Sequence, residues 1–145
     1  MNTLKDKSLF NKDAADILIK NHFYGPSIHC SYYRCIQYML HCIYLKPLAV
    51  KSDFTQKDIG THVIAINLIK AAISKMYMPD KGELASDLKY FVEQIYELKK
   101  LRKNADYDES VIKQEDSIIA QKKADAITDI IAKYLKLWMT KWPYG

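Results

Sequence analysis

The sequence predicts an all-α fold, an antiparallel four-helix bundle with one additional helix and about five helices in all. Its 145 residues suit a single domain over 1–145, because one hydrophobic core commonly serves about 100 to 200 residues. Four glycines and four prolines are too few for the many tight turns of a β-sandwich or barrel. Apolar residues recur every three or four positions, which is typical of helices that bury one face.

The first expected helix covers about residues 8–21, with Ser8 as its N-cap. Its expected core face consists of Phe10, Ala14, Ile17 and Leu18. Gly25 and Pro26 end this helix and open the second, over about residues 27–45, which stops before Pro47. The apolar stripe expected on the second helix consists of Ile28, Tyr32, Cys35, Ile36, Met39 and Ile43.

After a loop through residues 51–60, the third expected helix begins near Thr61 and stops before Pro79. Its expected core face consists of Ile66, Ile69, Ile73 and Met76. The fourth helix is expected over about residues 83–104, followed by a polar stretch over 107–114. The fifth is expected over about 115–138, where Ala120, Ala124, Ile127, Ile131, Tyr134 and Trp138 are in line.

The charge balance favours an anionic partner such as RNA, DNA or an acidic protein. Lysine and arginine total 22 against 17 acidic residues, a formal net charge of +5. Among the 22 basic residues, Arg34 and Arg102 are the two arginines. Because guanidinium groups are this scarce, the place of each in the fold carries information.

The sequence favours a cytoplasmic protein without a membrane segment. The amino end, MNTLKDKSLFNKD, holds no apolar run typical of a signal region, and no stretch of about 18 uncharged apolar residues occurs. Cys30, Cys35 and Cys42 are expected to be free thiols. Cys35 and Cys42 share a helix face but lie about 10 Å apart along the axis, too far for a disulfide.

Arg102 stands where a leucine would be expected. It continues an apolar row with steps of three and four, formed by Leu84, Leu88, Phe91, Ile95, Leu98 and then Ala105. A guanidinium on such a stripe must be paired or face a water-filled cleft, because burying it unpaired costs several kcal/mol. Asp106, four residues further on, is the nearest candidate partner. The alternative is that Arg102 extends into solvent from the end of the bundle.

The second helix carries two further rows that could bind a partner. Cys30, Arg34, Gln37 and His41 form a polar row, interpreted as a solvated face or as a strip that binds nucleic acid or protein. Tyr33, Leu40 and Tyr44 form an apolar flank beside it. This flank is expected either to be covered by the first or fifth helix or to form a homodimer interface.

His62 begins the core face of the third helix, where it is expected to bond a neighbouring polar group or to serve a site. The histidines show no pairing typical of a metal site, and no glycine loop for phosphate is present. No metal ion or cofactor is therefore expected. The basic string Lys99, Lys100, Arg102 and Lys103 is interpreted as a solvated face.

Three segments together resemble the HEPN domain, a helical family of higher eukaryotes and prokaryotes associated with nucleotide binding and RNA cleavage. HCSYYRCIQYML is similar to the family's S-x-YY-a-x-x-x-A segment, and THVIAINLI to its third-helix opening with a histidine, here His62. ELKKLRKNADYDES resembles the L-R-x-x-A-D-Y-D string of one bacterial and archaeal subgroup. The resemblance implies a HEPN-type bundle, a homodimer and a small nucleotidyltransferase partner, the two proteins forming a toxin–antitoxin module.

Ribonuclease members of the family have an arginine, four to six polar residues and then a histidine. The resemblance implies that Arg102 would hold phosphate, while the histidine would move the proton of the ribose 2′-hydroxyl without metal. Here Tyr107, Asp108 and Glu109 fill that window, so no histidine falls in it. A phenol with a pKa of about 10 is a poor base at neutral pH.

Three functions follow as alternatives. The first is a homodimer that binds RNA, a nucleotide or its partner protein at a cleft lined by Arg102, Asp106 and Tyr107, with Arg34 and Tyr33 as further binding residues. The second is a metal-independent endoribonuclease that uses Arg102 together with a displaced base, His62 or Tyr107. The third is a non-catalytic helical interaction module, in which Arg102 and Asp106 only pin the end of the bundle.

Overall fold

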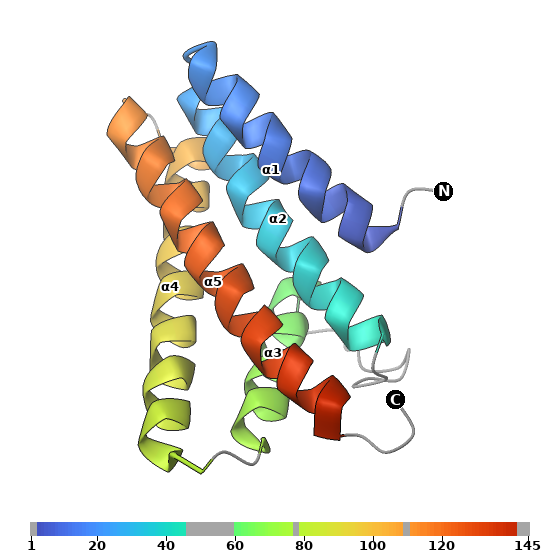
Figure 1. The fold of residues 1–145 in the computed structure, drawn as a ribbon. Coiled ribbons are helices and arrows are strands. Elements are labelled where there is room, and N and C mark those ends of the chain that lie inside the picture. Colours follow the sequence, from blue (N-terminus) through green and yellow to red (C-terminus); the bar gives the residue numbers. More distant parts are fainter. Residues whose placement is uncertain (1–2, 46–59, 77–78, 109–110, 142–145) are drawn as a thin grey trace.

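The computed structural model describes residues 3–45, 60–76, 79–108 and 111–141, with side chains in the last helix described as far as Tyr134. These residues form α1 (Leu4–Lys20), α2 (Tyr24–Leu45), α3 (Thr61–Ser74), α4 (Lys81–Tyr107) and α5 (Gln114–Lys141), shown in Figure 1. Within these ranges no strand occurs, and the prediction of an all-α bundle of about five helices is confirmed. The loop expected over 51–59 and the side chain of Trp138 lie outside the described residues.

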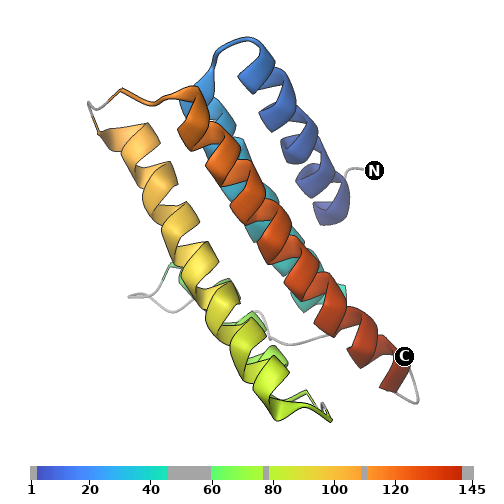
Figure 2. The same ribbon diagram turned by 60° about the vertical axis from the view of Figure 1, so that its left-hand side comes forward.

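α2 is the central helix, because it contacts all four of the others. α4 and α5 pack on each other and on α2, and α3 packs on α2 and α4. In Figure 1, α4 runs antiparallel to α2 and α5, which share one direction. Figure 2 shows, as does Figure 1, that α1 lies at the outer edge beside α2 and away from α4. The helices α2 to α5 therefore form the four-helix core, and α1 is the additional helix.

The core is built from the apolar stripes that the sequence predicts. All six expected residues of α2 are buried, as are Ile66, Ile69 and Ile73 of α3. α4 contributes Phe91, Ile95 and Leu98, and α5 contributes Ala120, Ala124, Ile127, Ile131 and Tyr134. Met76, Leu84 and Leu88 are partly buried against this cluster. Period-3.6 patterning thus located the buried face of each of the four core helices.

The first helix differs from the prediction in both its start and its buried face. It begins at Leu4, and its N-cap is Thr3, which forms a capping box with Asp6. Ser8 is therefore not the N-cap but a buried residue of the second turn. Phe10 and Ile17, expected in the core, are 57% and 59% exposed.

Small residues explain why α1 turns its larger apolar side chains outward. The buried residues of α1 are Ser8 and Ala15, which let the helix approach α2 closely. The Ser8 hydroxyl donates to the backbone oxygen of Arg34 at 2.8 Å, and the Ser27 hydroxyl donates to that of Ala15 at 2.9 Å. Because these bonds fix the rotation of α1, Phe10 and Ile17 face solvent, while Ala14 and Leu18 of the expected core face are half-buried.

Several other helix ends differ from the sequence prediction by a few residues, and two of them affect the candidate site. α2 begins at Tyr24, so Gly25 and Pro26 lie in its first turn rather than before it. Proline is tolerated there because a first-turn amide has no partner within the helix. α4 continues to Tyr107, past the expected end at residue 104, and therefore carries Asp106 in its last turn.

The three cysteines are free thiols, as expected. Cys35 and Cys42 are buried, and burial raises the pKa of each thiol to about 12. Among the described helices, none combines the length and apolar character needed to cross a membrane. In the same residues, no group of three or more His, Cys, Asp or Glu side chains could hold a metal ion.

Candidate functional site

Arg102 is held inside the bundle, one turn beyond Leu98 on the apolar stripe of α4, and is 9% exposed. Its Nη1 donates to Oδ2 of Asp106 at 3.4 Å, and its Cζ lies 4.9 Å from the centre of the Tyr32 ring. The predicted pairing of Arg102 with Asp106 is confirmed, because α4 continues past both residues. Nε of Arg102 is buried without a hydrogen-bond partner among the described residues.

Asp106 also holds His29, a residue that the sequence did not single out. Nδ1 of His29 lies 3.1 Å from Oδ2 and 3.3 Å from Oδ1 of Asp106. The imidazole also packs against Tyr33, one turn on in α2, with 4.5 Å between ring centres. The carboxylate therefore bridges the guanidinium of α4 and the imidazole of α2.

His62 extends this arrangement to α3. The Tyr32 hydroxyl and Nδ1 of His62 lie 3.1 Å apart, and the Tyr33 ring meets the His62 ring edge-on at 5.4 Å. Burial lowers the pKa of His62, and the charges of Arg102 and Lys99 lower it further. Burial raises the pKa of Tyr32 to about 12, so its hydroxyl stays protonated and can donate to the neutral imidazole. The expected bond between His62 and a neighbouring polar group is confirmed.

These side chains form one continuous group, called here the Arg102 cluster, which consists of His29, Tyr32, Tyr33, His62, Arg102 and Asp106. Four of the six residues predicted for a site belong to it: Arg102, Asp106, His62 and Tyr33. Tyr107 does not join them, since it is 80% exposed in the last turn of α4. Sequence reasoning missed two members of the cluster. Tyr32 was predicted only as a core residue, and the one local signal for His29 was its i, i+4 spacing from Tyr33.

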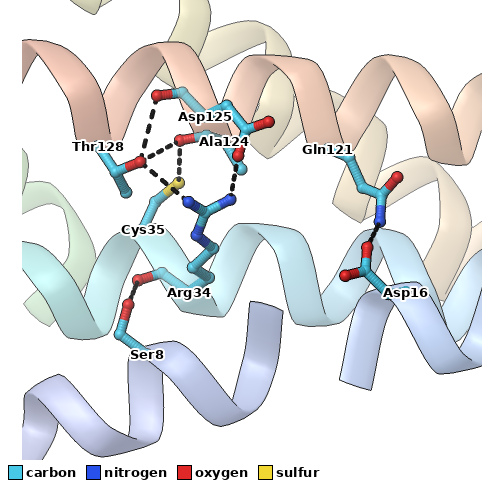
Figure 3. A network of polar contacts seen from close by, with 8 residues as sticks. All are labelled: Ser8, Asp16, Arg34, Cys35, Gln121, Ala124, Asp125 and Thr128. Atoms are coloured by element: carbon cyan, nitrogen blue, oxygen red, sulfur yellow. Dashed lines mark hydrogen bonds and ion pairs between the residues drawn. The ribbon is translucent and has the colours of Figure 1, made fainter. Parts of the chain in front are cut away.

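Arg34, the other arginine, lies elsewhere and is bound within the fold, as Figure 3 shows. Its Nη1 donates to Oδ1 of Asp125 at 2.6 Å, and its Nη2 donates to Oγ1 of Thr128 at 3.2 Å. Gln37, on the same row of α2, accepts a bond from Asn11 of α1 at 2.7 Å. The interpretation of this row as a solvated face is therefore wrong for Arg34 and Gln37, which pack between α2 and its neighbours.

The apolar flank of α2 is divided between the core and the surface. Tyr33 and Leu40 are partly buried against the core, and Tyr33 meets His62 of α3 rather than α1 or α5. Tyr44 is exposed. The predicted homodimer interface on this flank stays a prediction.

The cluster has Lys99 and Lys103 nearby and is open at one side. Lys99 is partly buried, and its pKa is lowered by burial and by the charges of Lys103 and Arg102. Against the cluster lies an open pocket of about 490 Å³, lined by Gly25, Pro26, His29, Cys30, Ala105 and Asp106. An anion that enters this pocket meets the imidazole of His29 and the carboxylate that neutralises Arg102.

The arrangement provides two chemical functions. Arginine has five N–H donors, and the buried Nε of Arg102 has no hydrogen-bond partner among the described residues, so the guanidinium has donor capacity beyond its 3.4 Å bond to Asp106. Asp106 engages Nδ1 of His29 and leaves Nε2 to exchange a proton with a ligand. Anion binding and proton transfer by an oriented imidazole can therefore occur side by side.

The chain was compared with protein-family models, with curated proteins and with solved structures, and none of them matches it.

Proposed function

We propose that this protein binds RNA or a nucleotide through a phosphate group at the Arg102 cluster. The observation that carries this proposal is the state of Arg102, which is buried, is bonded to Asp106 at 3.4 Å and has an Nε without a hydrogen-bond partner among the described residues. A guanidinium in such a position destabilises the fold, since a buried donor without a hydrogen-bond partner lowers the free energy of unfolding by about 1–3 kcal/mol. A guanidinium binds phosphate well, because two of its N–H groups can reach two phosphate oxygens.

Asp106 is expected to compete with the phosphate. Its carboxylate occupies Nη1 of Arg102, so a bound phosphate replaces or shares that contact. When His29 is protonated, it is a second cation that pairs with Asp106. Removing the carboxylate charge should therefore raise the affinity for phosphate instead of lowering it.

Fluorescence anisotropy with a short labelled RNA tests this proposal. Arg102→Gln should weaken binding by about tenfold or more, because a hydrogen bond to a charged group contributes about 1.5–3 kcal/mol. Arg34→Gln is the matched control and should leave the affinity unchanged, while Asp106→Asn should increase it. Equal affinities for the wild type and Arg102→Gln would contradict the proposal and leave Arg102 with the structural role of pinning the bundle end.

The pairing of His29 with Asp106 favours one alternative, a metal-independent endoribonuclease. His29 Nε2 would take the proton of a ribose 2′-hydroxyl, whose oxygen would attack the phosphorus held by Arg102. The bond to the 5′-oxygen would break, and that oxygen would take a proton from water. The products would be a 2′,3′-cyclic phosphate and a 5′-hydroxyl.

His29 suits the role of base better than the two residues expected from the sequence. The Tyr32 hydroxyl donates to Nδ1 of His62, so Nε2 of that ring carries the proton and cannot accept another, and Tyr107 is a phenol outside the cluster. RNA should then be cut in the presence of a chelator, and His29→Ala should abolish cutting while His41→Ala retains it. RNA that stays intact for hours would leave the binding function alone.

The resemblance to HEPN proteins extends the proposal to the assembly. It supports a homodimer with a composite cleft and a small nucleotidyltransferase partner, the two proteins forming a toxin–antitoxin module; the sequence itself favours a cytoplasmic location. Sedimentation at micromolar concentration should give about twice the chain mass of 16.9 kDa. If the protein is a monomer and still binds RNA, the proposal of a composite cleft is contradicted. If the protein binds no RNA but binds the nucleotidyltransferase, it is an interaction module.

A further inference from the structure

Lys99 differs from the other lysines of its basic string, because it is half-buried among cations. Lys100 and Lys103 are exposed, as expected of a solvated face, whereas Lys99 is not. Residues three and four positions away on a helix are its neighbours on the same face. For Lys99 these neighbours are Ile95, Tyr96, Arg102 and Lys103. Two of them are cations and none is an acid.

The described part of α3 adds no acid to this environment. His62, in the first turn of α3, is close enough for the charge of Lys99 to lower its pKa. The N-cap of α3, Gly60, has no side-chain hydrogen bond, so the first amide groups of this helix keep their partial positive charge. Asp106, two turns further along α4, is already paired with Arg102 and His29. Among the described residues, Lys99 forms no ion pair.

This environment disfavours the charged form of Lys99. Burial removes part of the hydration of its ammonium group, and the charges of Lys103 and Arg102 repel a third cation, so the pKa of Lys99 is lowered. A lysine amine that is desolvated and lies beside other cations is a more effective nucleophile. Lys89, on the same helix, is the opposite case, because its side chain is 79% exposed and lies 3.9 Å from Glu93, four residues on.

The same charges favour one electrophile over others. Acylation of the amine would leave a neutral amide beside Arg102 and Lys103. Addition of carbon dioxide leaves an anion instead, so that two like-charge pairs become two opposite-charge pairs. An acid followed by a base four positions later is also the favourable order on a helix. Carbon dioxide is small enough to reach a half-buried amine without a cavity beside it.

We propose that Lys99 is a site of reversible carbamylation by dissolved carbon dioxide. The lone pair of Nζ attacks the carbon of carbon dioxide, and one C=O electron pair moves onto oxygen. An N–H proton then passes to water, which leaves a carbamate anion. The step is an addition followed by loss of a proton, so it needs no oxidant or reductant. The inference concerns a modification and does not depend on the proposed phosphate site.

Equilibration of the full chain with isotope-labelled bicarbonate in mildly alkaline buffer tests the proposal. Carbon NMR should show a carbamate signal, and trapping with triethyloxonium followed by peptide mass spectrometry should assign it to Lys99. The α-amino group, with a pKa of about 8, is expected to react as well, so the assignment by peptide is required. Lys99→Arg should abolish the lysine carbamate, because a guanidinium stays protonated. Lys89 is the matched control and should stay unmodified, since Glu93 stabilises its ammonium group.

Lys103→Gln tests the electrostatic cause. It removes one like charge beside Lys99, so the carbamate fraction should fall at least about threefold, the effect of a unit charge at about 6 Å in water. Lys81→Gln, which changes an exposed lysine in the first turn of the same helix, should leave the fraction unchanged.

Several results would overturn the proposal. These are the absence of carbamate on Lys99, equal carbamylation of Lys89, and an unchanged carbamate fraction in Lys103→Gln. Trace labelling with acetic anhydride adds one more. If Lys99 reacts with this reagent more readily than Lys89 but takes up no carbon dioxide, its amine is nucleophilic and its neighbours do not stabilise the carbamate.

Discussion

Replacing Arg102 and Asp106 singly and together should reveal a strong energetic coupling between these side chains. Their closest atoms are 3.4 Å apart, and the Asp106 side chain is 22% exposed. At an effective dielectric constant of about 20, two unit charges at this distance attract by roughly 5 kcal/mol. Desolvation of the guanidinium offsets part of this attraction, so a coupling of about 3 kcal/mol is expected.

The three variants should differ in their free energy of unfolding, in a definite order. Asp106→Asn should be the least stable, by about 3 kcal/mol, because it leaves the charge of Arg102 buried without an anion. Arg102→Leu should lose only about 1–2 kcal/mol, since Asp106 keeps His29 as a partner and leucine completes the apolar stripe. The double variant should be within about 1 kcal/mol of the wild type, because removing both charges leaves neither of them buried without a partner.

Urea unfolding followed by circular dichroism measures these differences, with the m-value checked for constancy. Each kcal/mol should also shift the Tm by about 2–4 °C for a chain of this length. A coupling below about 0.5 kcal/mol would refute the reasoning, because that is the value typical of a solvent-exposed pair. Arg102 would then be a surface residue, and the site built around it would lose its foundation.

Three further predictions follow from other contacts. The pKa of His62 is lowered in the fold, so the unfolded chain binds a proton at this residue more tightly than the folded chain does. The free energy of unfolding should therefore fall as the pH drops below about 6.5. In unfolding measured at several pH values, His62→Gln should reduce this fall. Arg34→Leu should lower stability by about 1–3 kcal/mol in thermal unfolding, because Asp125 and Thr128 lose their shared partner; an unchanged Tm would show that this network is not stabilising. Ala15→Leu should lower the free energy of unfolding by about 1–3 kcal/mol, because the larger side chain pushes α1 away from α2. Phe10→Ser should change it by less than about 0.5 kcal/mol, because Phe10 is exposed. If Phe10→Ser is the more destabilising of the two, the buried face of α1 is the one predicted from the sequence.

Local periodicity was sufficient to predict the core and the central pair of the site. The stripes of α2 to α5 are periodic over several turns, and the bond between Arg102 and Asp106 joins residues four apart on one helix. Both signals lie within a short window of sequence. The anomaly of an arginine on an apolar stripe therefore located the cluster before its other members were known.

Contacts between distant segments could not be predicted in this way. Asp106 and His29 are 77 residues apart in the chain, and Arg34 and Asp125 are 91 apart, so no spacing rule connects them. The buried face of the first helix was predicted wrongly for another reason, because both faces of this helix carry apolar residues. Its pairing with α2 was decided by the small side chains of Ser8 and Ala15, which periodicity counts as weak or polar.

The NMR signals of the arginine Nε–H groups test the central claim most directly. The sequence has two arginines, so an isotope-labelled sample should give two such signals, and Arg102→Gln and Arg34→Gln assign them. On titration with adenosine monophosphate or a short RNA, the signal of Arg102 should shift as its Nη groups exchange Asp106 for phosphate, while that of Arg34 should stay in place. A shift of Arg34 alone, or of neither arginine while the ligand binds, would contradict the assignment of Arg102 as the phosphate-binding residue.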